Sequence, residues 1–240
     1  MALTFRLSAL ALLVAVSATP AISQGQPEPV PPPFNSTVIA AFRSKVLMNP
    51  PASPGSDPYD GPPLPTPNAT RVCGVLYEDE ATRSEYRLTT FDSREQAEGA
   101  GAHVSHLTEC GLCSSTKDLA AYMTHWDMTA PVRLCGVAGA ISRELGLQCL
   151  RELGLTEPCA EIWLYNAEHT RTECLLPCLE NWGAPYNNED GSLNDCLQCD
   201  EDKSGPVFQA VAARTRRNSG MRSAIFRPPE TIADIDHDYW

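Results

Sequence analysis

The chain has 240 residues, with 18 lysines and arginines against 30 aspartates and glutamates, so its formal net charge at pH 7 is −12. A nucleic-acid-binding surface needs basic side chains that replace phosphate counterions. Docking on anionic lipid also needs positively charged side chains. The acidic balance therefore argues against both kinds of partner and favours a well-solvated protein.

The N-terminus has the layout of a cleaved secretory signal. Arg6 supplies a positive charge, an apolar run follows over residues 7–16, and small side chains at Ala21 and Ser23 suit signal peptidase. We predict a signal peptide over residues 1–23; its removal leaves 17 basic minus 30 acidic residues, a charge of −13. The run is shorter than the roughly 20 residues of a spanning helix, so we predict no stable membrane insertion. The mature chain is expected to be secreted, extracellular or in the secretory-pathway lumen.

Residues 24–69 are rich in proline, because 13 of the 21 prolines lie between Pro27 and Pro67. Proline lacks a backbone donor and favours extended conformers, so the composition predicts a disordered arm. A pattern of helical spacing interrupts the arm after possible caps at Asn35 and Ser36. We interpret it as a transient helix, with a short docking helix or part of a propeptide as alternatives. Its apolar residues are Val38, Ile39, Phe42 and Val46.

Two N-x-Ser/Thr sequons lie in the same arm, at Asn35 and Asn68. The motif is short and arises often by chance. Here the two motifs follow a secretory signal and lie in an arm expected to be exposed. We therefore predict N-glycosylation at both asparagines.

Residues 70–240 have a length that suits one cysteine-rich globular domain. Its first part alternates β-forming segments with one short capped helix, which predicts a small α/β unit. The expected strands are 71–77, 86–91 and 102–107, and the expected helix is 94–98.

The remainder of the domain has helical patterns and caps. Gly146 is expected to interrupt the second of these helices, and Thr156 to cap the fourth. The fold class predicted is therefore α+β, with a small α/β N-terminal part and a helix-rich, disulfide-stapled majority. The expected helices are 116–125, 132–145, 147–153, one that begins after Thr156, and 207–217.

The ten cysteines lie between residues 73 and 199, and an even number in an exported chain predicts five disulfides, each typically worth about 2–4 kcal/mol. The sequence leaves their connectivity open. The candidates are Cys73, Cys110, Cys113, Cys135, Cys149, Cys159, Cys174, Cys178, Cys196 and Cys199.

The last four cysteines also have a spacing typical of a four-thiolate zinc site, with Cys174-x3-Cys178 followed by Cys196-x2-Cys199. In an oxidising compartment such cysteines usually pair with one another. We therefore predict disulfides and no cofactor, and keep zinc bound by these four residues as the alternative.

A second group with possible chemistry is His106, Cys110 and Cys113, which lie between an expected strand and a helix start. The unpaired amides and the dipole at a helix N-terminus stabilise a thiolate, and His106 could act as its base. Strand, Cys-x-x-Cys and helix are also placed this way in thioredoxin-like redox sites. The alternative that we favour is a structural disulfide at the start of a helix that Ser115 and Asp118 shape.

Residues 101–120, which contain His106-x3-Cys110-Gly111-Leu112-Cys113-Ser114, resemble a group of uncharacterised secreted cysteine-rich proteins of microbial eukaryotes. Shorter similarities lie at 194–201 and 216–220. The resemblance covers most of the domain and none of the proline-rich arm. It implies secretion and the domain limits, and it implies no activity.

Residues 214–217 match the Arg-x-Arg-Arg pattern that secretory convertases cut, although arginines that close a helix are the interpretation we favour. The function predicted is a secreted, disulfide-stabilised binding protein whose partner is an extracellular protein or a small molecule. The alternative is an extracytoplasmic thiol-dependent enzyme or redox protein centred on His106, Cys110 and Cys113.

Overall fold

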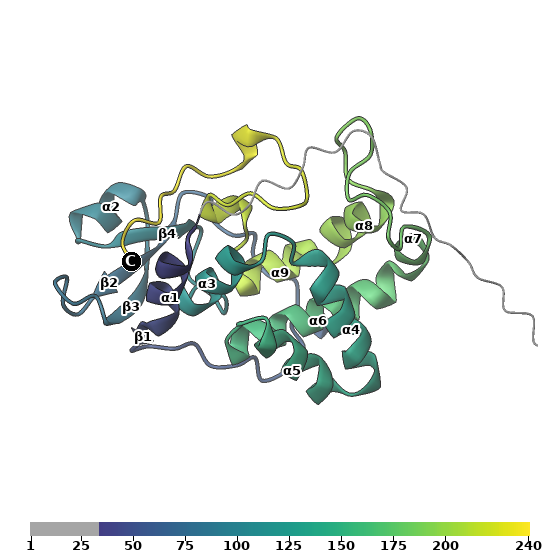
Figure 1. The fold of residues 1–240 in the computed structure, drawn as a ribbon, viewed down its shortest axis with the longest axis horizontal. Coiled ribbons are helices and arrows are strands. Elements are labelled where there is room, and N and C mark those ends of the chain that lie inside the picture. The colour runs from purple at the N-terminus through teal and green to yellow at the C-terminus, as the bar shows by residue number, and fades with distance from the viewer. Residues whose placement is uncertain (1–33) are drawn as a thin grey trace, which may run out of the picture.

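The computed structural model describes residues 34–240 and contains a sheet with flanking helices on one side and a helical part on the other (Figure 1). The fold class is α+β, as predicted. The signal peptide and residues 24–33 of the arm lie outside the described residues. Among the residues described, no helix is both long enough and apolar enough to cross a membrane.

The sheet has four strands in the order β1-β3-β2-β4. β2 pairs antiparallel with both β3 and β4, whereas the short β1 pairs parallel with β3. The three strands expected from the sequence are confirmed within a residue at each end. Burial alternates along β3, whereas β2 and β4 have consecutive buried residues. The strands are β1 (Val46–Leu47), β2 (Val72–Tyr77), β3 (Glu85–Phe91) and β4 (His103–Leu107).

Residues 34–60 belong to the packed domain, so the prediction of a disordered arm is wrong there. Asn35 caps helix α1 (Ser36–Ser44) by accepting from the backbone N of Val38 at 3.0 Å. One turn further on, Phe42 is fully buried, and its ring centroid lies 5.1 Å from that of Tyr239. Burying these apolar side chains stabilises a helix that would be marginal alone. The extended conformation that the proline content predicts is found in the connection that follows α1.

Tyr59 fixes that connection to the helical part. It lies in the 3-10 turn η1 (Pro58–Asp60), and its ring stacks on His169 with centroids 4.3 Å apart. Its hydroxyl donates to Asn166 Oδ1 at 2.8 Å and to the carbonyl of Ser204 at 3.0 Å. The connection between α1 and Tyr59 is therefore attached at both of its ends.

The helical part places the helices of residues 129–212 beside one another (Figure 1). Predicted helices are found in α2, α3 and α6, whereas α7 and α8 were not predicted. α9 ends at Ala212, five residues before its expected end. The helices are α2 (Arg94–Gly99), α3 (Thr116–Thr124), α4 (Thr129–Ile141), α5 (Arg143–Glu152), α6 (Glu157–Glu173), α7 (Leu175–Glu180), α8 (Asp195–Lys203) and α9 (Gly205–Ala212).

Gly146 does not interrupt a helix, contrary to the sequence-based expectation. The break falls at Ser142, between α4 and α5, and Gly146 lies buried inside α5. A Cβ at Gly146 would lie 2.7 Å from the Cα of Gly139, and one at Gly139 would lie 2.6 Å from Leu164 Cδ1. The two glycines allow α4 and α5 to approach each other closely over α6.

The prediction of five disulfides is confirmed, and none of the cysteines in the part of the chain described is free. One bond joins β2 to the loop after β4, and one joins the loop before α3 to α6. A third bond joins α4 to α5, and the last two join the region of α7 to α8. The four cysteines of the zinc alternative bond to one another, so they leave no thiolates for a metal. The pairs are Cys73–Cys110, Cys113–Cys159, Cys135–Cys149, Cys174–Cys199 and Cys178–Cys196.

The C-terminal segment crosses back from the helices to the sheet, where the chain ends (Figure 1). It contains two short 3-10 turns, η2 (Arg217–Ser219) and η3 (Pro229–Thr231). Its last buried residue, Tyr239, accepts at its carbonyl from Tyr77 Oη at 2.7 Å and stacks on His103. These contacts hold the end of the chain against β2 and β4.

Candidate functional site

His106, the base of the thiol-enzyme hypothesis, is fully buried on β4. Its Nδ1 lies 2.8 Å from the carbonyl oxygen of Leu107, which can only accept, so Nδ1 carries the proton. Its Nε2 accepts from the Ser114 hydroxyl at 2.7 Å, and that hydroxyl accepts from Gly111 N. Burial, and then the nearby charge of Arg214, hold the pKa of His106 well below its usual value. His106 is therefore a neutral residue that holds a loop in place.

Cys110 and Cys113 are both occupied by disulfides to distant partners, Cys73 and Cys159. Cys113 is fully buried as well. The thiol-dependent alternative consequently has no nucleophile, and the two cysteines do not form a redox pair with each other. The expected helix start is nevertheless present, because Ser115 Oγ accepts from the backbone N of Asp118 at 3.0 Å.

Arg214 is the largest fully buried side chain, and all of its guanidinium donors are used. Nε donates to the carbonyl of Cys113 at 2.9 Å, and Nη1 donates to the carbonyl of Ser105 and the hydroxyl of Ser219, both at 3.2 Å. Nη2 donates to the hydroxyl of Ser105 at 2.7 Å and the carbonyl of Ser114 at 2.9 Å. The residue thus ties together β4, the loop before α3 and the C-terminal segment.

Neither interpretation of the arginine run at 214–217 survives in the fold. A convertase needs the basic residues in an accessible strand, whereas Arg214 is buried. Closure of α9 by these arginines is excluded too, because that helix ends at Ala212, and Ala213 has a positive φ of 64° that turns the chain away.

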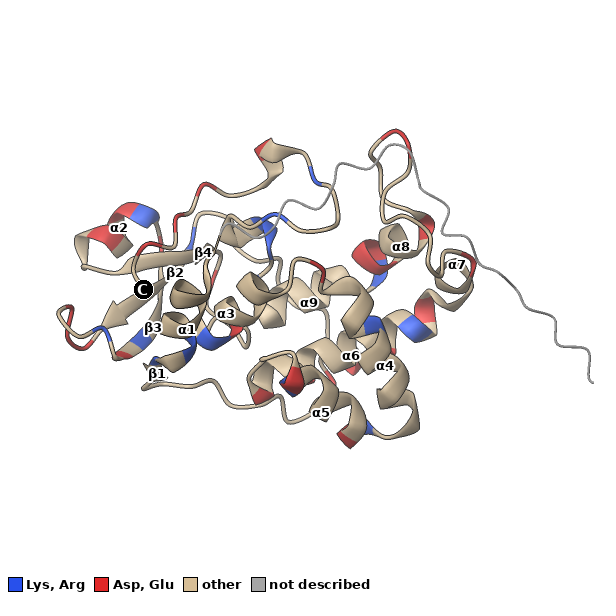
Figure 2. Cartoon of the chain, viewed as in Figure 1, with Lys and Arg blue, Asp and Glu red and all other residues tan. Residues whose placement is uncertain are grey.

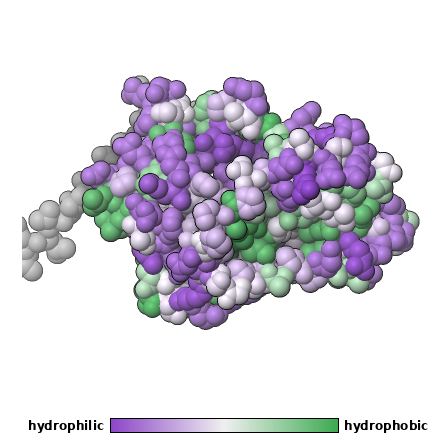
Figure 3. All heavy atoms as spheres, turned by 180° about the vertical axis from the view of Figure 1, so that it is seen from behind, coloured by the Kyte–Doolittle hydropathy of each residue, from purple (hydrophilic) through white to green (hydrophobic). Residues whose placement is uncertain are grey.

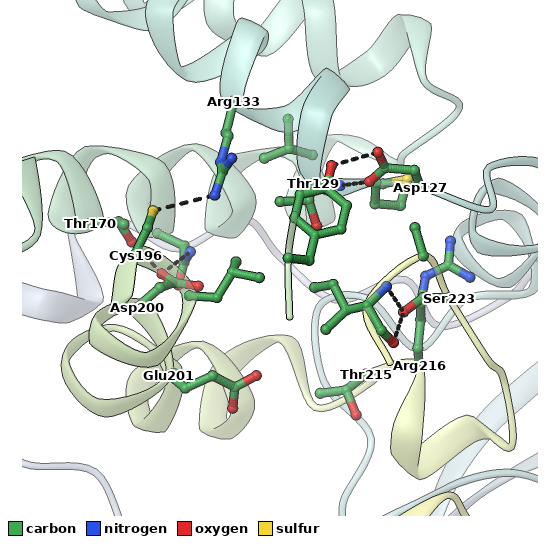
Figure 4. Close-up of a pocket in the computed structure, with 18 of the residues that line it drawn as sticks. Asp127, Thr129, Arg133, Thr170, Cys196, Asp200, Glu201, Thr215, Arg216 and Ser223 are labelled. Atoms are coloured by element: carbon green, nitrogen blue, oxygen red, sulfur yellow. Dashed lines mark hydrogen bonds between the residues drawn. The ribbon is translucent and has the colours of Figure 1, made fainter. Parts of the chain in front are cut away.

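A cleft of about 910 Å³ lies between the helices and the C-terminal segment. α4, α6, α7, α8 and α9 form its helical walls, and residues 215–232 form the opposite wall (Figure 4). This volume falls within the range of roughly 300–1,000 Å³ typical of small-molecule sites. Its deeper lining is apolar and aromatic, and includes Tyr122, Val132, Trp163, Leu197, Phe208 and Met221.

An aromatic group forms the core of this lining. Trp163 on α6 and Phe208 on α9 pack edge to face, with ring centroids 4.7 Å apart. The indole Nε1 of Trp163 donates to the hydroxyl of Tyr122 on α3 at 3.2 Å. Burial raises the pKa of Tyr122 to about 12, so its hydroxyl stays protonated. The rings are therefore held in fixed positions by one another and by the helices that carry them.

Two aspartates of the lining are held by hydrogen bonds (Figure 4). Asp127 accepts from Thr129 N at 2.7 Å and from the Tyr186 hydroxyl at 2.6 Å, which fixes the start of α4. Asp200 on α8 accepts from the Thr170 hydroxyl and, at 3.3 Å, from Asn166 Nδ2. Burial raises the pKa of Asp200 above its usual value. The cleft therefore combines apolar side chains with polar groups in fixed positions, which is a common composition of small-molecule sites.

Apolar side chains also reach the surface near the rim of the cleft. Val137 of α4 and Leu179 of α7 line the cleft and are 52% and 59% exposed, and Trp182 beyond α7 is 57% exposed. On the face seen from behind, hydrophobic areas likewise interrupt a mostly hydrophilic surface (Figure 3). No group of three or more histidine, cysteine or acidic side chains suited to a metal ion occurs within residues 34–240.

The cleft was not predicted from the sequence. Its lining comes from helices far apart in the chain and from a C-terminal segment without regular spacing. The density of arginine from residue 214 to 227 was an available signal, but residues 214–217 were interpreted as the closure of a helix, with a processing motif as the alternative.

A family of unknown function, DUF8771, matches residues 143–235, which is less than half of the chain. The matched range contains α6 to α9 and the C-terminal wall of the cleft, and leaves out His106, Cys110 and Cys113. Neither the curated proteins nor the solved structures contain a match to this chain.

Proposed function

We propose that this protein is a secreted, disulfide-stabilised binding protein that holds an apolar small molecule in the cleft between its helices and its C-terminal segment. The observation that carries this proposal is the cleft itself, with its volume of about 910 Å³ and its aromatic lining. An open apolar cleft of this size leaves many side chains without packing partners, and this loss of packing lowers stability. That the fold retains such a cleft supports a function for it.

The disulfides support a binding role in an extracytoplasmic compartment. Cys174–Cys199 and Cys178–Cys196 fix the α7 region to α8, and Cys135–Cys149 fixes α4 to α5, so the cleft walls are pre-organised. A rigid site loses less conformational entropy on binding than a flexible one. Export is a separate part of the proposal, and N-terminal sequencing of protein released by an expressing eukaryotic cell tests it. We expect the mature chain to begin at Gln24.

Titration with an uncharged probe whose fluorescence rises in apolar surroundings, N-phenyl-1-naphthylamine, tests the cleft. We expect saturable binding of about one probe per chain to the oxidised, folded protein. The Ala140→Trp variant adds an indole at the rim on α4, and we expect it to weaken binding at least five-fold.

The matched control is Ala40→Trp, which changes another exposed helical alanine, on α1 and away from the cleft. It should bind the probe as the unchanged protein does. Saturable binding that both tryptophan variants retain in full would place the probe elsewhere, and absence of saturable binding would refute the proposed function.

A further inference from the structure

The cleft concentrates positive charge in a protein that is acidic as a whole. Of its lining residues six are arginines and three are acidic, so the lining has a formal charge of 6 − 3 = +3. The complete chain has 18 basic and 30 acidic residues. Figure 2 shows acidic residues in both halves of the molecule, including positions on α2, α5 and α8. Basic residues are therefore enriched in the lining of the proposed ligand site.

Arg133 is a basic residue of the lining whose guanidinium has no strong acceptor among the described residues. It extends from α4 into the cleft toward α8 (Figure 4), and its Nη2 lies 3.3 Å from Cys196 Sγ. A disulfide sulfur is a weak acceptor. The guanidinium also lies 5.8 Å from the centre of the Tyr186 ring. Within residues 34–240 it has no carboxylate partner at ion-pair distance, so most of its hydrogen-bonding capacity is unused.

Two further arginines of the cleft share a single carboxylate. Arg217 Nη2 lies 3.1 Å from one oxygen of Glu201, and Arg227 pairs with the other oxygen. One negative charge therefore faces two positive charges at this wall, which leaves a local excess of one positive charge.

Arg216 adds positive charge at the same wall without a carboxylate partner among the described residues. It donates to the backbone carbonyls of His125 and Arg222, and its guanidinium lies 5.6 Å from the centre of the Tyr122 ring. Burial lowers its pKa to about 10, so it remains protonated at neutral pH.

The other two carboxylates of the lining do not compensate for these charges through ion pairs. Asp127 is occupied by Tyr186 and the backbone at the start of α4, and Asp200 accepts from Thr170 and Asn166. In a cleft with apolar walls, where water is partly excluded, unpaired charges interact more strongly with a ligand than they would in water.

We infer that the ligand of the cleft is an amphiphile, with an apolar chain that contacts the aromatic lining and an anionic head group that pairs with Arg133. A carboxylate or a phosphate ester fits, because the planar guanidinium can bind either with two parallel hydrogen bonds. This inference rests on the proposed function, and names the class of ligand for the same cleft.

A series of ligands with one chain and head groups of three kinds, anionic, neutral and cationic, tests the inference by displacement of the neutral probe. Dodecanoate, dodecanol and dodecyltrimethylammonium carry an anionic, a neutral and a cationic group, and monododecyl phosphate distinguishes phosphate from carboxylate. We expect the better of the two anions to bind at least ten-fold more tightly than the alcohol, and the cation to bind more weakly than the alcohol.

Three variants link any such preference to the charges of the cleft. Arg133→Gln should reduce the preference for the anion at least five-fold and leave binding of dodecanol unchanged. Glu201→Gln removes the shared carboxylate and should strengthen binding of the anion. Arg87→Gln is the control, because it also removes one positive charge but lies on β3, with its side chain 54% exposed and paired with Glu78.

The possible failures are distinguishable. If the probe binds and the three head groups compete equally, or if the cation competes best, the inference about charge is overturned while the cleft remains a binding site. If Arg87→Gln lowers the anion preference as much as Arg133→Gln does, net charge and not Arg133 is responsible, and the assignment of the head-group site fails. If the probe itself does not bind, the proposed function fails first.

Discussion

Replacing Arg214 by methionine tests whether one buried guanidinium holds the sheet, the α3 loop and the C-terminal segment together. Methionine has a similar length but no donors. The change would leave the carbonyls of Ser105, Cys113 and Ser114 and the hydroxyls of Ser105 and Ser219 without their charged donor. The side chain is buried completely, so water cannot replace the lost hydrogen bonds without a rearrangement.

The expected loss follows from the number of acceptors affected. An unsatisfied buried acceptor typically costs about 1–3 kcal/mol, but hydroxyls can rotate toward other partners, and removing a buried charge recovers several kcal/mol of desolvation. We therefore expect Arg214→Met to lower the free energy of unfolding by about 4 kcal/mol, which is a large part of the roughly 5–15 kcal/mol of a typical domain. Arg214→Lys keeps the charge but has three donors in place of five, so it should lose about 2–3 kcal/mol.

Urea unfolding of the oxidised protein at pH 7, followed by tryptophan fluorescence, measures both losses. The control is Arg87→Met, whose exposed ion pair with Glu78 should contribute less than about 1 kcal/mol. If Arg214→Met does not fold, Arg214→Lys still gives a measurable midpoint. A stability of Arg214→Met within 1 kcal/mol of the unchanged protein would refute the role assigned to this side chain.

Three further predictions concern packing, pH and modification. Gly146→Ala should lower stability by about 1–3 kcal/mol, because its Cβ would lie 2.7 Å from Gly139 Cα; Gly99→Ala, with no atom within 4 Å, should be neutral in the same thermal melts. Burial lowers the pKa of His237 to about 4, so the unfolded chain binds a proton below pH 6.5 that the folded chain excludes, and stability falls by about 3 kcal/mol as the pH drops from 6.5 to 4. Urea unfolding at pH 7 and 4.5 should show a smaller drop for His237→Asn, and equal drops would exclude this origin. Asn68 is exposed, and its Oδ1 accepts from the backbone N and hydroxyl of Thr70 while Nδ2 stays available, so Asn68→Gln should reduce the mass of the secreted glycoprotein by one glycan; an unchanged mass would show the sequon to be unused.

Local patterns in the sequence were sufficient to predict the strands and several helix starts. The number of cysteines was sufficient to predict five disulfides but not which cysteines pair. Ser93, Ser115 and Asn35 cap helices because a side-chain oxygen can accept from a backbone N a few residues on, which is a local interaction. At the α3 start the predicted cap and the favoured interpretation of its cysteines as structural disulfides are confirmed, whereas the thiolate alternative is wrong. Whether a cysteine at a helix start is a reactive thiolate or part of a disulfide depends on a partner far along the chain, here Cys159 for Cys113.

The sequence by itself determined the α+β class and the disulfide-rich character of this protein, because alternation, capping and cysteine number are properties of short segments or of composition. Only the tertiary structure decided that α1 belongs to the core, that Arg214 is a buried donor to three segments of the chain, and that arginines lie around an apolar cleft. Burial is the physical reason. The same arginine is a solvated charge, a protease site or a structural donor according to what surrounds it, and those surroundings come from segments that meet only when the chain has folded.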